Sequence, residues 1–572
     1  MAQQRHPGTS NSVSQILSRS SYIWLPLSIA ILFAAPSITF MLPSPTSYLA
    51  EEYQPFQALE FWGTKGQAYH KYGPLGNFLL APGYGISLAY WYLKGTFSTP
   101  STTFPYGFEK PLEQISFLIF QSRVIFLIAS VALLGYFVRN LRLITQHKVA
   151  IFFAFLFCIA TNYPAISILP STRPDSLMLA FGAAALGVYL QIVYLGLTPL
   201  RGLWLSLFAV CAVTSKEMIG PMFILPYLAI GLVGWRATRD SAQERRQFLI
   251  SVGATLVTAI VVYALLNVVY APVIWWQRIY YWLFGEGIDS ATWGGLESGA
   301  ITLVDYIWII GKTVLNNLGP GGIIVALLSV IALVLIQPNR WLLLSLPFIS
   351  MVAIGLAPIG YARDRFYILA ALSLVPMVTA GLAALYDRAG TLVRLRWLTV
   401  ALAIPALINL VWGTFTWHAL TINPDLMIEQ HAKAHLSPGT SLYVLFPYAT
   451  VPGRSRLDWL GYSRDTRPLQ EIVDAPPATR AEWLYATTGQ ISFVENCRQF
   501  PARAQMLQRQ AGFKIETWSG IEGLGYSKVE VLDLKTPSWF VFDWMPVVQG
   551  LRERNTVLVF HKIPSKIPTE SK

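Results

Sequence analysis

The sequence predicts an α-helical polytopic membrane protein with about eleven transmembrane (TM) helices and a small C-terminal α/β domain. Its 572 residues are 54% hydrophobic and only 13% charged, whereas soluble globular domains carry about 25% charged residues. Apolar runs of about 20 residues, the length needed to cross a hydrocarbon core, recur along residues 20–417. From about Ala419 onward the composition becomes that of a soluble domain.

The formal net charge of +12 comes largely from basic residues in short loops between apolar runs. This pattern is typical of membrane orientation rather than of nucleic-acid binding, so we expect no nucleic-acid partner. Of the three cysteines only Cys497 lies in the soluble tail, which excludes a disulfide within that domain. No clear cleavage site follows the first apolar run at Tyr22, so we expect a retained anchor.

Basic residues also predict which loops face the cytoplasm. The N-terminal tail, residues 1–21, carries Arg5 and Arg19 and is expected there. So are the three densest basic loops, residues 139–148, 236–246 and 386–396. The absence of Asn-x-Ser/Thr sequons and the compact loops favour a bacterial plasma (inner) membrane.

The apolar stretch Gly73–Leu93 is the exception among the apolar runs. If it crossed the membrane as well as 117–138, the basic loop 139–148 would face outward, against its charge. The stretch contains Pro74, Pro82 and several aromatic residues, which suits a helix lying at the membrane surface. We therefore expect residues 43–116 to form one external loop.

With this assignment the C-terminus lies outside, and residues 22–417 form the membrane domain. Residues 271–316, rich in aromatic side chains, are expected to form a second external loop. The predicted spans are residues 22–42, 117–138, 149–168, 177–196, 202–215, 218–235, 247–270, 318–337, 340–358, 366–385 and 396–417.

Residues 418–572 are expected to form the extracytoplasmic α/β domain. Residues 498–511 predict a helix, and Ala475–Pro477 a loop. Strand-like runs occur at Ser441–Phe446, Gln490–Val494, Lys514–Trp518 and Thr556–Phe560.

The candidate functional residues are ionisable groups at membrane depth or in external loops, because their desolvation requires a reason. The predicted topology places all of them on one side. They are the acidic pair Glu51 and Glu52, His70 with Lys71, Asp175, Lys216 beside Glu217, Arg363 with Arg365, and, as a weaker member, Arg278.

Each candidate also has a purely structural interpretation. The acidic pair could be a solvated loop start, and Lys71 could extend its ammonium group to the interface. Asp175 could cap the following helix through its side chain. Lys216 and Glu217 could form a local ion pair. Only for Arg363 and Arg365 does a functional role outweigh the alternative, because two external arginines oppose the orientation bias and arginine suits phosphate.

Together these residues predict a cavity at the outer face with carboxylates on one part and cations on another. Such a site suits chemistry on a lipid-linked phosphate. A carboxylate would deprotonate an attacking hydroxyl. The donor phosphate would be bound, and its charge stabilised as it departs, by Lys71, Lys216, Arg278, Arg363 and Arg365. No cofactor is required, because an activated sugar would arrive on lipid.

In these motifs the chain resembles the GT-C superfamily of membrane glycosyltransferases, in particular protein O-mannosyltransferases (family 39) and aminoarabinose transferases. The resemblance covers about residues 20–417. Its motifs are, in order, Glu-Glu after the first span, Lys-Tyr-Gly-Pro-Leu at residues 71–75, Arg-Pro-Asp at 173–175, Ser-Lys-Glu at 215–217, and Asp-Arg-Phe-Tyr-Ile-Leu at 364–369.

The resemblance implies inverting transfer of a hexose or pentose from a polyprenyl-phosphate donor to an acceptor glycan, lipid or protein. It implies that Glu51 or Glu52 is the catalytic base and that Asp175 is a second catalytic acid. Lys71, Arg363 and Arg365 fall where the family contacts lipid phosphate. The family usually has Asp-Glu in its first loop, so which Glu is the base stays open. A divalent metal at His70 is an open alternative.

A secondary transporter or a lipid-linked sugar flippase is the main alternative function. It would need charges near the bilayer midplane and commonly repeated halves, whereas no repeat is evident here. A lipid-linked sugar polymerase or ligase, and a non-enzymatic scaffold or receptor, are further alternatives. The sequence does not identify the sugar, the acceptor or the oligomeric state.

Overall fold

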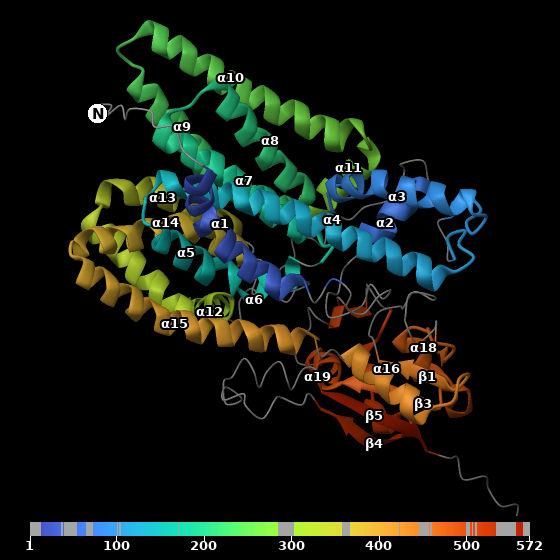
Figure 1. Cartoon of the computed structure of the whole chain (residues 1–572). Coiled ribbons are helices and arrows are strands. Elements are labelled where there is room, and N and C mark those ends of the chain that lie inside the picture. Colours follow the sequence, from blue (N-terminus) through green and yellow to red (C-terminus); the bar gives the residue numbers. More distant parts are fainter. Residues whose placement is uncertain are drawn as a thin grey trace, which may run out of the picture.

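The computed structural model describes residues 13–35, 38, 54–63, 72–99, 101, 105–169, 171–283, 303–356, 367–421, 424–445, 457, 460–498, 504–505, 507–508, 512–533 and 556–563. Its N-terminal part is a bundle of helices and its C-terminal part a small mixed domain (Figure 1). The chain is a membrane protein: seven of the described helices are long and apolar enough to cross a bilayer.

The first ten α-helices described in the bundle are α1 (Val13–Ala34), α2 (Gln54–Gly63), α3 (Leu75–Leu93), α4 (Pro111–Asn140), α5 (Lys148–Phe155), α6 (Tyr163–Ile168), α7 (Pro174–Leu195), α8 (Pro199–Ser215), α9 (Pro221–Ala237) and α10 (Ala242–Tyr263). They are followed by α11 (Pro272–Leu283), α12 (Leu303–Ile336), α13 (Pro338–Ser350), α14 (Ile368–Ala389) and α15 (Leu392–Thr421). Several helices begin with proline at the first helical position, where its missing N–H costs nothing.

Each predicted span coincides with an apolar helix. The seven long candidates are residues 113–143, 174–195, 217–237, 242–269, 317–336, 368–389 and 392–414. The other four predicted spans match shorter apolar helices at residues 24–34, 148–160, 199–215 and 340–356. Whether those four cross the bilayer stays a prediction, and so does the number of eleven crossings.

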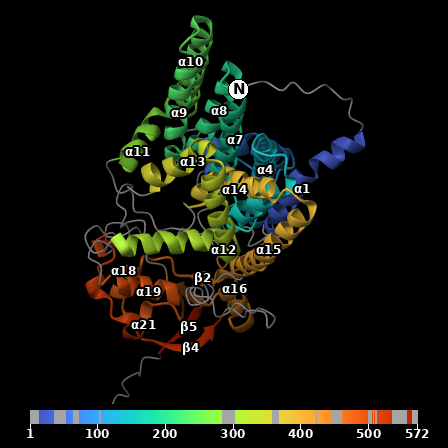
Figure 2. The ribbon, with the colours of Figure 1, turned by 90° about the vertical axis from the view of Figure 1, so that its left-hand side faces the viewer.

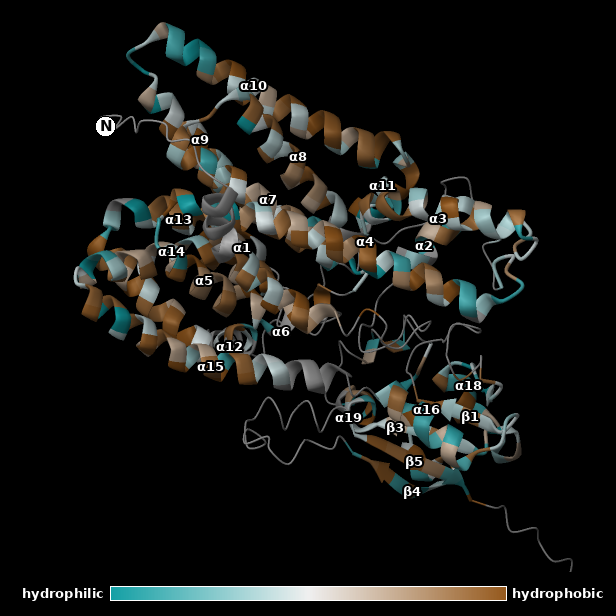
Figure 3. Cartoon of the chain, in the orientation of Figure 1, coloured by the Kyte–Doolittle hydropathy of each residue, from teal (hydrophilic) through white to brown (hydrophobic). Residues whose placement is uncertain are grey.

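The core of the bundle is built on α7 and α14, whose most apolar segments are 83% and 94% buried inside the protein. In α10 the corresponding share is 11%, so this helix lies at the periphery of the bundle. Figure 3 shows hydrophobic residues along α10 and α12, and hydrophilic ones where α9 turns into α10, within the predicted cytoplasmic loop.

Helix α12 is broken at Gly319, which has φ +70° and is followed by Pro320. The backbone groups freed by this break are bound by Asn409 of α15, which is fully buried. Its Oδ1 accepts from the N–H groups of Gly321 (3.0 Å) and Gly322 (3.1 Å), and its Nδ2 donates to the carbonyl of Leu318 (2.7 Å). One side chain thus satisfies a kink at membrane depth, where water is absent.

The apolar stretch predicted not to cross forms α3, and α3 is not among the candidate spans of the described residues. It packs antiparallel to the first half of α4. Tyr84 hydrogen-bonds Ser122 (2.7 Å), Ser87 donates to Gln121 (3.1 Å), and Trp91 meets Phe117 edge-on. The predicted surface helix is therefore one arm of a helical hairpin. Its position relative to the bilayer stays a prediction.

The expected external loop 271–316 is partly helical. Residues 272–283 form α11, and α12 already begins at Leu303. The aromatic residues Trp275, Trp276 and Tyr280 therefore lie in a helix rather than in a loop. The intervening residues 284–302 lie outside the described part of the chain.

The C-terminal domain contains a five-stranded sheet in the order β2-β1-β3-β5-β4. Its β1, β2 and β3 pair in parallel, and β3, β5 and β4 antiparallel. Its elements are α16 (Pro424–His435), β1 (Ser441–Val444), β2 (Ser463–Arg464), α18 (Leu469–Asp474), β3 (Trp483–Thr487), α19 (Thr488–Asn496), α21 (Gly520–Gly523), β4 (Tyr526–Leu532) and β5 (Val557–Lys562). In Figures 1 and 2 the sheet lies beyond the end of α15.

Two of the four predicted strands are correct, namely β1 and β5. The predicted strand Gln490–Val494 is wrong, because these residues belong to α19. The predicted strand Lys514–Trp518 is wrong as well, since it contains a 3₁₀ turn at Ile515–Thr517. Of the predicted helix at 498–511, residues 504–505 and 507–508 are helical, and most of the rest lie outside the described residues.

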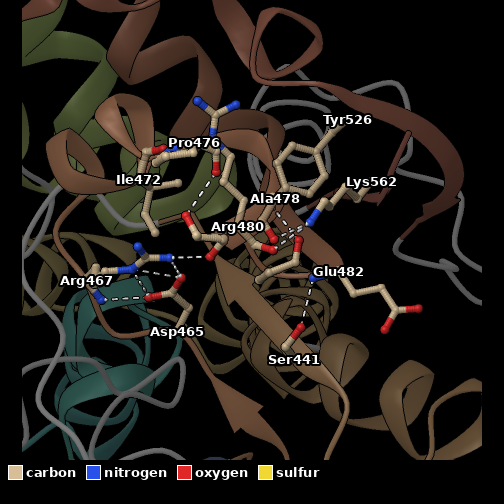
Figure 4. A network of polar contacts seen from close by, with 12 residues as sticks. Ser441, Asp465, Arg467, Ile472, Pro476, Ala478, Arg480, Glu482, Tyr526 and Lys562 are labelled. Carbon is tan, nitrogen blue, oxygen red and sulfur yellow. Dashed lines mark hydrogen bonds and ion pairs between the residues drawn. The ribbon is translucent and has the colours of Figure 1, made fainter. Parts of the chain in front are cut away.

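A network of polar contacts made by Arg467, Arg480 and Lys562 connects the loops beside this sheet (Figure 4). Arg467 holds the carboxylate of Asp465 with two nitrogens, at 3.0 and 2.6 Å. Arg480 donates to the carbonyls of Ile472 (3.1 Å) and Val473 (2.9 Å) at the end of α18. Lys562 donates to the carbonyl of Ala478 (3.0 Å). These contacts satisfy carbonyl groups and give the cluster a structural role.

Candidate functional site

Asp175 lies in the first turn of α7, and its side chain is 2% exposed. Pro174 starts the helix, and the helix N-terminus favours a negative charge at this place. The N-cap residue is Arg173, whose side chain makes no cap hydrogen bond. Oδ1 of Asp175 accepts from Nζ of Lys216 at 2.7 Å. The carboxylate is therefore part of a tertiary ion pair, and its capping of the helix stays a prediction.

Lys216 occupies the break between α8 and α9. Its backbone is extended (φ −158°, ψ 121°), so α8 ends there, and a 3₁₀ turn at Glu217–Ile219 leads into α9. Its side chain is also 2% exposed. The local ion pair of Lys216 with Glu217 is wrong, because each side chain pairs with a distant residue.

Glu217 pairs with Arg278 of α11, with 2.7 Å between Oε1 and Nε. Arg278 is 1% exposed, so the residue expected to be the weakest member lies at the centre of the cluster. Its guanidinium meets two further acceptors: Nη1 donates to the carbonyl of Tyr72 (3.2 Å), and Nη2 to Oδ1 of Asn267 (2.6 Å). Arg278 thus joins α11 to three other segments of the chain.

Tyr72 connects the two ion pairs. Its ring centroid lies 5.0 Å from Nζ of Lys216, which is a cation–π geometry, while its carbonyl accepts from Arg278. The next residue, Gly73, is pressed against α8. A Cβ there would lie 1.5 Å from the carbonyl oxygen of Thr214. Only glycine allows this approach, so residues 72–73 are held directly beside the charged cluster.

Asn267 completes the network from a π-helical turn, Ala264–Val269, that follows α10. Its Nδ2 donates to Oγ1 of Thr214 (3.0 Å) and to the carbonyl of Tyr263 (3.1 Å), while Oδ1 accepts from Arg278. Single π-helical turns inside α-helices occur frequently at functional sites. This one directs a polar amide into the cluster.

The cluster therefore contains two carboxylates and two cations, which balance to zero formal charge. Buried charges are tolerated when each has a partner and its remaining polar atoms are satisfied. In a neutral cluster with alternating charges the polar groups are held in fixed positions, and its cations can attract an anionic ligand. These are the properties expected of a preorganised polar site.

Three of the sequence-predicted site residues, Asp175, Lys216 and Arg278, are brought together in this cluster. The candidates Glu51, Glu52, His70, Lys71, Arg363 and Arg365 lie outside the described residues. The sequence did not single out Tyr72, Asn267 or the tertiary role of Glu217. Tyr72 could have been recognised from its place in the Lys-Tyr-Gly-Pro-Leu motif, whereas Asn267 has no local signal.

Among the described residues, no group of three or more histidine, cysteine, aspartate or glutamate side chains is arranged to hold a metal ion. Asp175 and Glu217 each face a cation instead. The described cluster therefore does not fit a metal centre. The metal hypothesis for His70 concerns residues outside this part of the chain.

No protein-family model matches the sequence, and no curated protein matches it. Among solved structures, the chain is similar to ArnT from Cupriavidus metallidurans in the apo state, with 13% identity and a TM-score of 0.46 over 84% of this chain and 95% of that chain. For ArnT bound to undecaprenyl phosphate the values are 12% and 0.44, over 85% and 95%.

The chain is also similar to the oligosaccharyltransferase of Archaeoglobus fulgidus in the apo form, with 12% identity and a TM-score of 0.45 over 89% of this chain and 73% of that chain. Because each TM-score is below 0.5, the likenesses assign no residue role or substrate here.

Proposed function

We propose that this chain is an inverting membrane glycosyltransferase. It transfers a sugar from a polyprenyl-phosphate donor to an acceptor hydroxyl at the outer face of the plasma membrane. The observation that carries the proposal is the cluster of buried Asp175, Lys216 and Arg278 with half-buried Glu217, packed against residues 72–73.

The cluster supports this function because it holds Tyr72, the residue next to the candidate Lys71 in the sequence, in a fixed position. Lys71 directly precedes Tyr72, whose ring and carbonyl contact Lys216 and Arg278. The backbone at Gly73 cannot move away from Thr214 without opening the cluster. Lys71 is thus attached to a rigid anchor, which suits a side chain that must meet a phosphate in a defined position.

In the proposed reaction a carboxylate of Glu51 or Glu52 removes the proton of the acceptor hydroxyl. The hydroxyl oxygen forms a bond to the anomeric carbon while the bond from that carbon to the phosphate oxygen breaks. The leaving phosphate keeps the electron pair. Lys71, Arg363 and Arg365 stabilise its growing charge. Attack from the face opposite the phosphate inverts the anomeric centre.

Within this reaction Asp175 and Lys216 act at the base of the site. Lys216 holds the Asp175 carboxylate in place, and the carboxylate keeps the ammonium group from binding the donor phosphate too tightly. Arg278 donates to protein acceptors through Nη1 and Nη2, and its Nε lies 2.7 Å from Oε1 of Glu217 in the ion pair. We therefore assign it to positioning residues 72–73 and Glu217 as well as to the electrostatic field at the phosphate.

The orientation belongs to the same proposal. The N-terminus and the basic loops face the cytoplasm, and residues 418–572 form a domain on the outside. The reaction as written uses no cofactor. A divalent metal at His70 with a first-loop carboxylate is tested separately, by adding and then reversing a chelator in the activity assay.

The test is a transfer assay with purified full-length protein and a polyprenyl-phosphate sugar, comparing Glu51→Gln, Glu52→Gln and Asp175→Asn. We expect at least one of the first two variants to lose about 100-fold or more in rate, because proton transfer contributes about that factor. Full activity in all three variants would refute the assignment.

A further inference from the structure

A groove of about 590 Å³ runs between α1 and α4 on the side of the bundle. It shares no lining residue with the charged cluster and plays no part in the proposed reaction. Its walls are almost entirely apolar, and its lining residues are Trp24, Ile31, Leu127, Ile128, Val131, Ala132, Gly135, Tyr136 and Arg139. Trp24 is 58% exposed and Ile128 is 65% exposed, so the groove is open to the surroundings of the bundle.

The length of the groove matches one leaflet of a bilayer. Arg139 lies 12 positions after Leu127 on α4, which corresponds to about 18 Å along the helix axis. Half of a hydrocarbon core is about 15 Å thick. The groove therefore extends from a membrane–water interface to about the bilayer midplane, the depth that a single acyl chain occupies.

The two ends of the groove differ in chemistry. Trp24, Tyr136 and Arg139 lie at one end, and Leu127 and Ile128 lie toward the other. Tryptophan and tyrosine favour the headgroup level of a membrane, and an exposed arginine there attracts anionic lipid. Arg139 opens the basic loop 139–148, which is predicted to face the cytoplasm. The polar end therefore matches the anionic surface of the cytoplasmic leaflet.

The cavity between the helices exists because α4 has no side chain at Gly135. A Cβ at this position would meet only Cδ1 of Leu27, at 3.4 Å, which is ordinary contact. Because Gly135 lines the groove, a larger side chain there would take up part of its volume. Gly135 thus offers a way to fill the site selectively.

We propose that this groove is a binding site for an anionic phospholipid of the cytoplasmic leaflet. One acyl chain lies between α1 and α4, and the phosphate of the headgroup meets Arg139. The site is separate from the one that takes the polyprenyl-phosphate donor, which is proposed for the opposite face.

The experiment is native mass spectrometry of the full-length protein in detergent, titrated with phosphatidylglycerol. Gly135→Leu fills the groove, and Arg139→Gln removes the charge. Gly253→Leu is the matched control for the first, because a Cβ at Gly253 of α10 meets nothing within 4 Å. Arg142→Gln, in the same basic loop but outside the groove lining, is the control for the second.

We expect the most tightly bound phosphatidylglycerol to weaken at least about ten-fold in Gly135→Leu, since a buried chain contributes about 0.8 kcal/mol per methylene. In Arg139→Gln we expect a loss of about five-fold, the factor for one basic residue at an anionic surface. Both controls should bind like the unmodified protein.

Unchanged binding in Gly135→Leu would overturn the proposal, and so would equal losses in the controls. Added polyprenyl phosphate distinguishes the two lipid sources. If Gly135→Leu abolished binding of polyprenyl phosphate and left phosphatidylglycerol unaffected, the groove would hold the donor tail, and the proposal would be wrong. Transfer activity plays no part in this readout, so failure of the proposed function would leave it interpretable.

Discussion

Substituting Lys216 alone, and Lys216 together with Asp175, separates the structural role of their ion pair from its chemical role. Lys216→Met leaves the Asp175 carboxylate, 2% exposed, without the ammonium group 2.7 Å away. Breaking a buried pair in this way costs about 3–5 kcal/mol of folding free energy. In Lys216→Met/Asp175→Asn the uncompensated charge is gone. The contact of Lys216 with the Tyr72 ring stays lost, worth up to about 2 kcal/mol.

The order of stability is measured as the midpoint of thermal unfolding in one detergent. We expect Lys216→Met lowest, the double variant intermediate and the unmodified protein highest. Glu113→Gln is the control, since its pair with Lys110 is exposed (66% and 74%) and the distance is 3.9 Å. Transfer activity should stay low in the double variant although stability returns. Full activity in the double variant would refute a chemical role for Asp175, and equal stability of single and double variants would refute the coupling.

Three further predictions follow from the described contacts. Gly73→Ala should lower both the unfolding midpoint and the transfer rate, because its Cβ would lie 1.5 Å from the Thr214 carbonyl oxygen. A displacement that raises the activation free energy by about 1.4 kcal/mol lowers the rate ten-fold, and we expect at least this loss. Gly253→Ala, whose Cβ has no neighbour within 4 Å, should change neither quantity. Asn409→Leu should destabilise the protein by about 2–4 kcal/mol, since the buried N–H groups of Gly321 and Gly322 lose their acceptor. An unchanged unfolding midpoint would show that Asn409 does not stabilise the break in α12. Burial raises the pKa of Asp425 in the C-terminal domain to about 7, reinforced by Glu429 and opposed by Arg464. Because the folded state then binds the proton more tightly, its contribution to stability falls as pH rises from about 4 to 7; Asp425→Asn should flatten this dependence, and an identical pH profile would show that Asp425 is not the titrating group.

The membrane part of the fold was predictable because hydrophobic length is a strong local signal. Each predicted span corresponds to an apolar helix, and the stretch at Gly73–Leu93, which forms α3, is not among the candidate spans of the described residues. The same signal cannot show that α3 and α4 pair as a hairpin. That pairing depends on contacts such as Tyr84 with Ser122, 38 positions apart in sequence.

The C-terminal domain was harder to predict because its segments are short and tertiary contacts decide their conformation. Residues 490–494 have the composition of a strand. However, Thr487 and Gln490 form a capping box that starts a helix: Oγ1 of Thr487 accepts from the N–H of Gln490 at 3.0 Å, and Oε1 of Gln490 accepts from the N–H of Thr487 at 2.9 Å. That Thr-x-x-Gln signal was present in the sequence. Strand β4 was missed because it is an exposed edge strand without an apolar run.

For the site, the sequence indicated the right kinds of residue but not their partners. Asp175 and Lys216 were candidates because charged groups at membrane depth need a reason. Their direct pairing, and that of Glu217 with Arg278, join segments far apart in the chain. Asn267 enters the cluster only because the helix after α10 adopts a π-helical turn, which no local pattern announces.

The most direct test of the central claim is an experimental structure of the protein with bound polyprenyl phosphate in lipid nanodiscs. We predict the phosphate within hydrogen-bonding distance of Lys71, Arg363 or Arg365, next to the Asp175–Lys216 pair, with a Glu51 or Glu52 carboxylate facing it across one cavity at the outer face. A separation of more than about 15 Å between the first-loop carboxylates and the phosphate would contradict the mechanism, because acid–base catalysis requires contact or one bridging water.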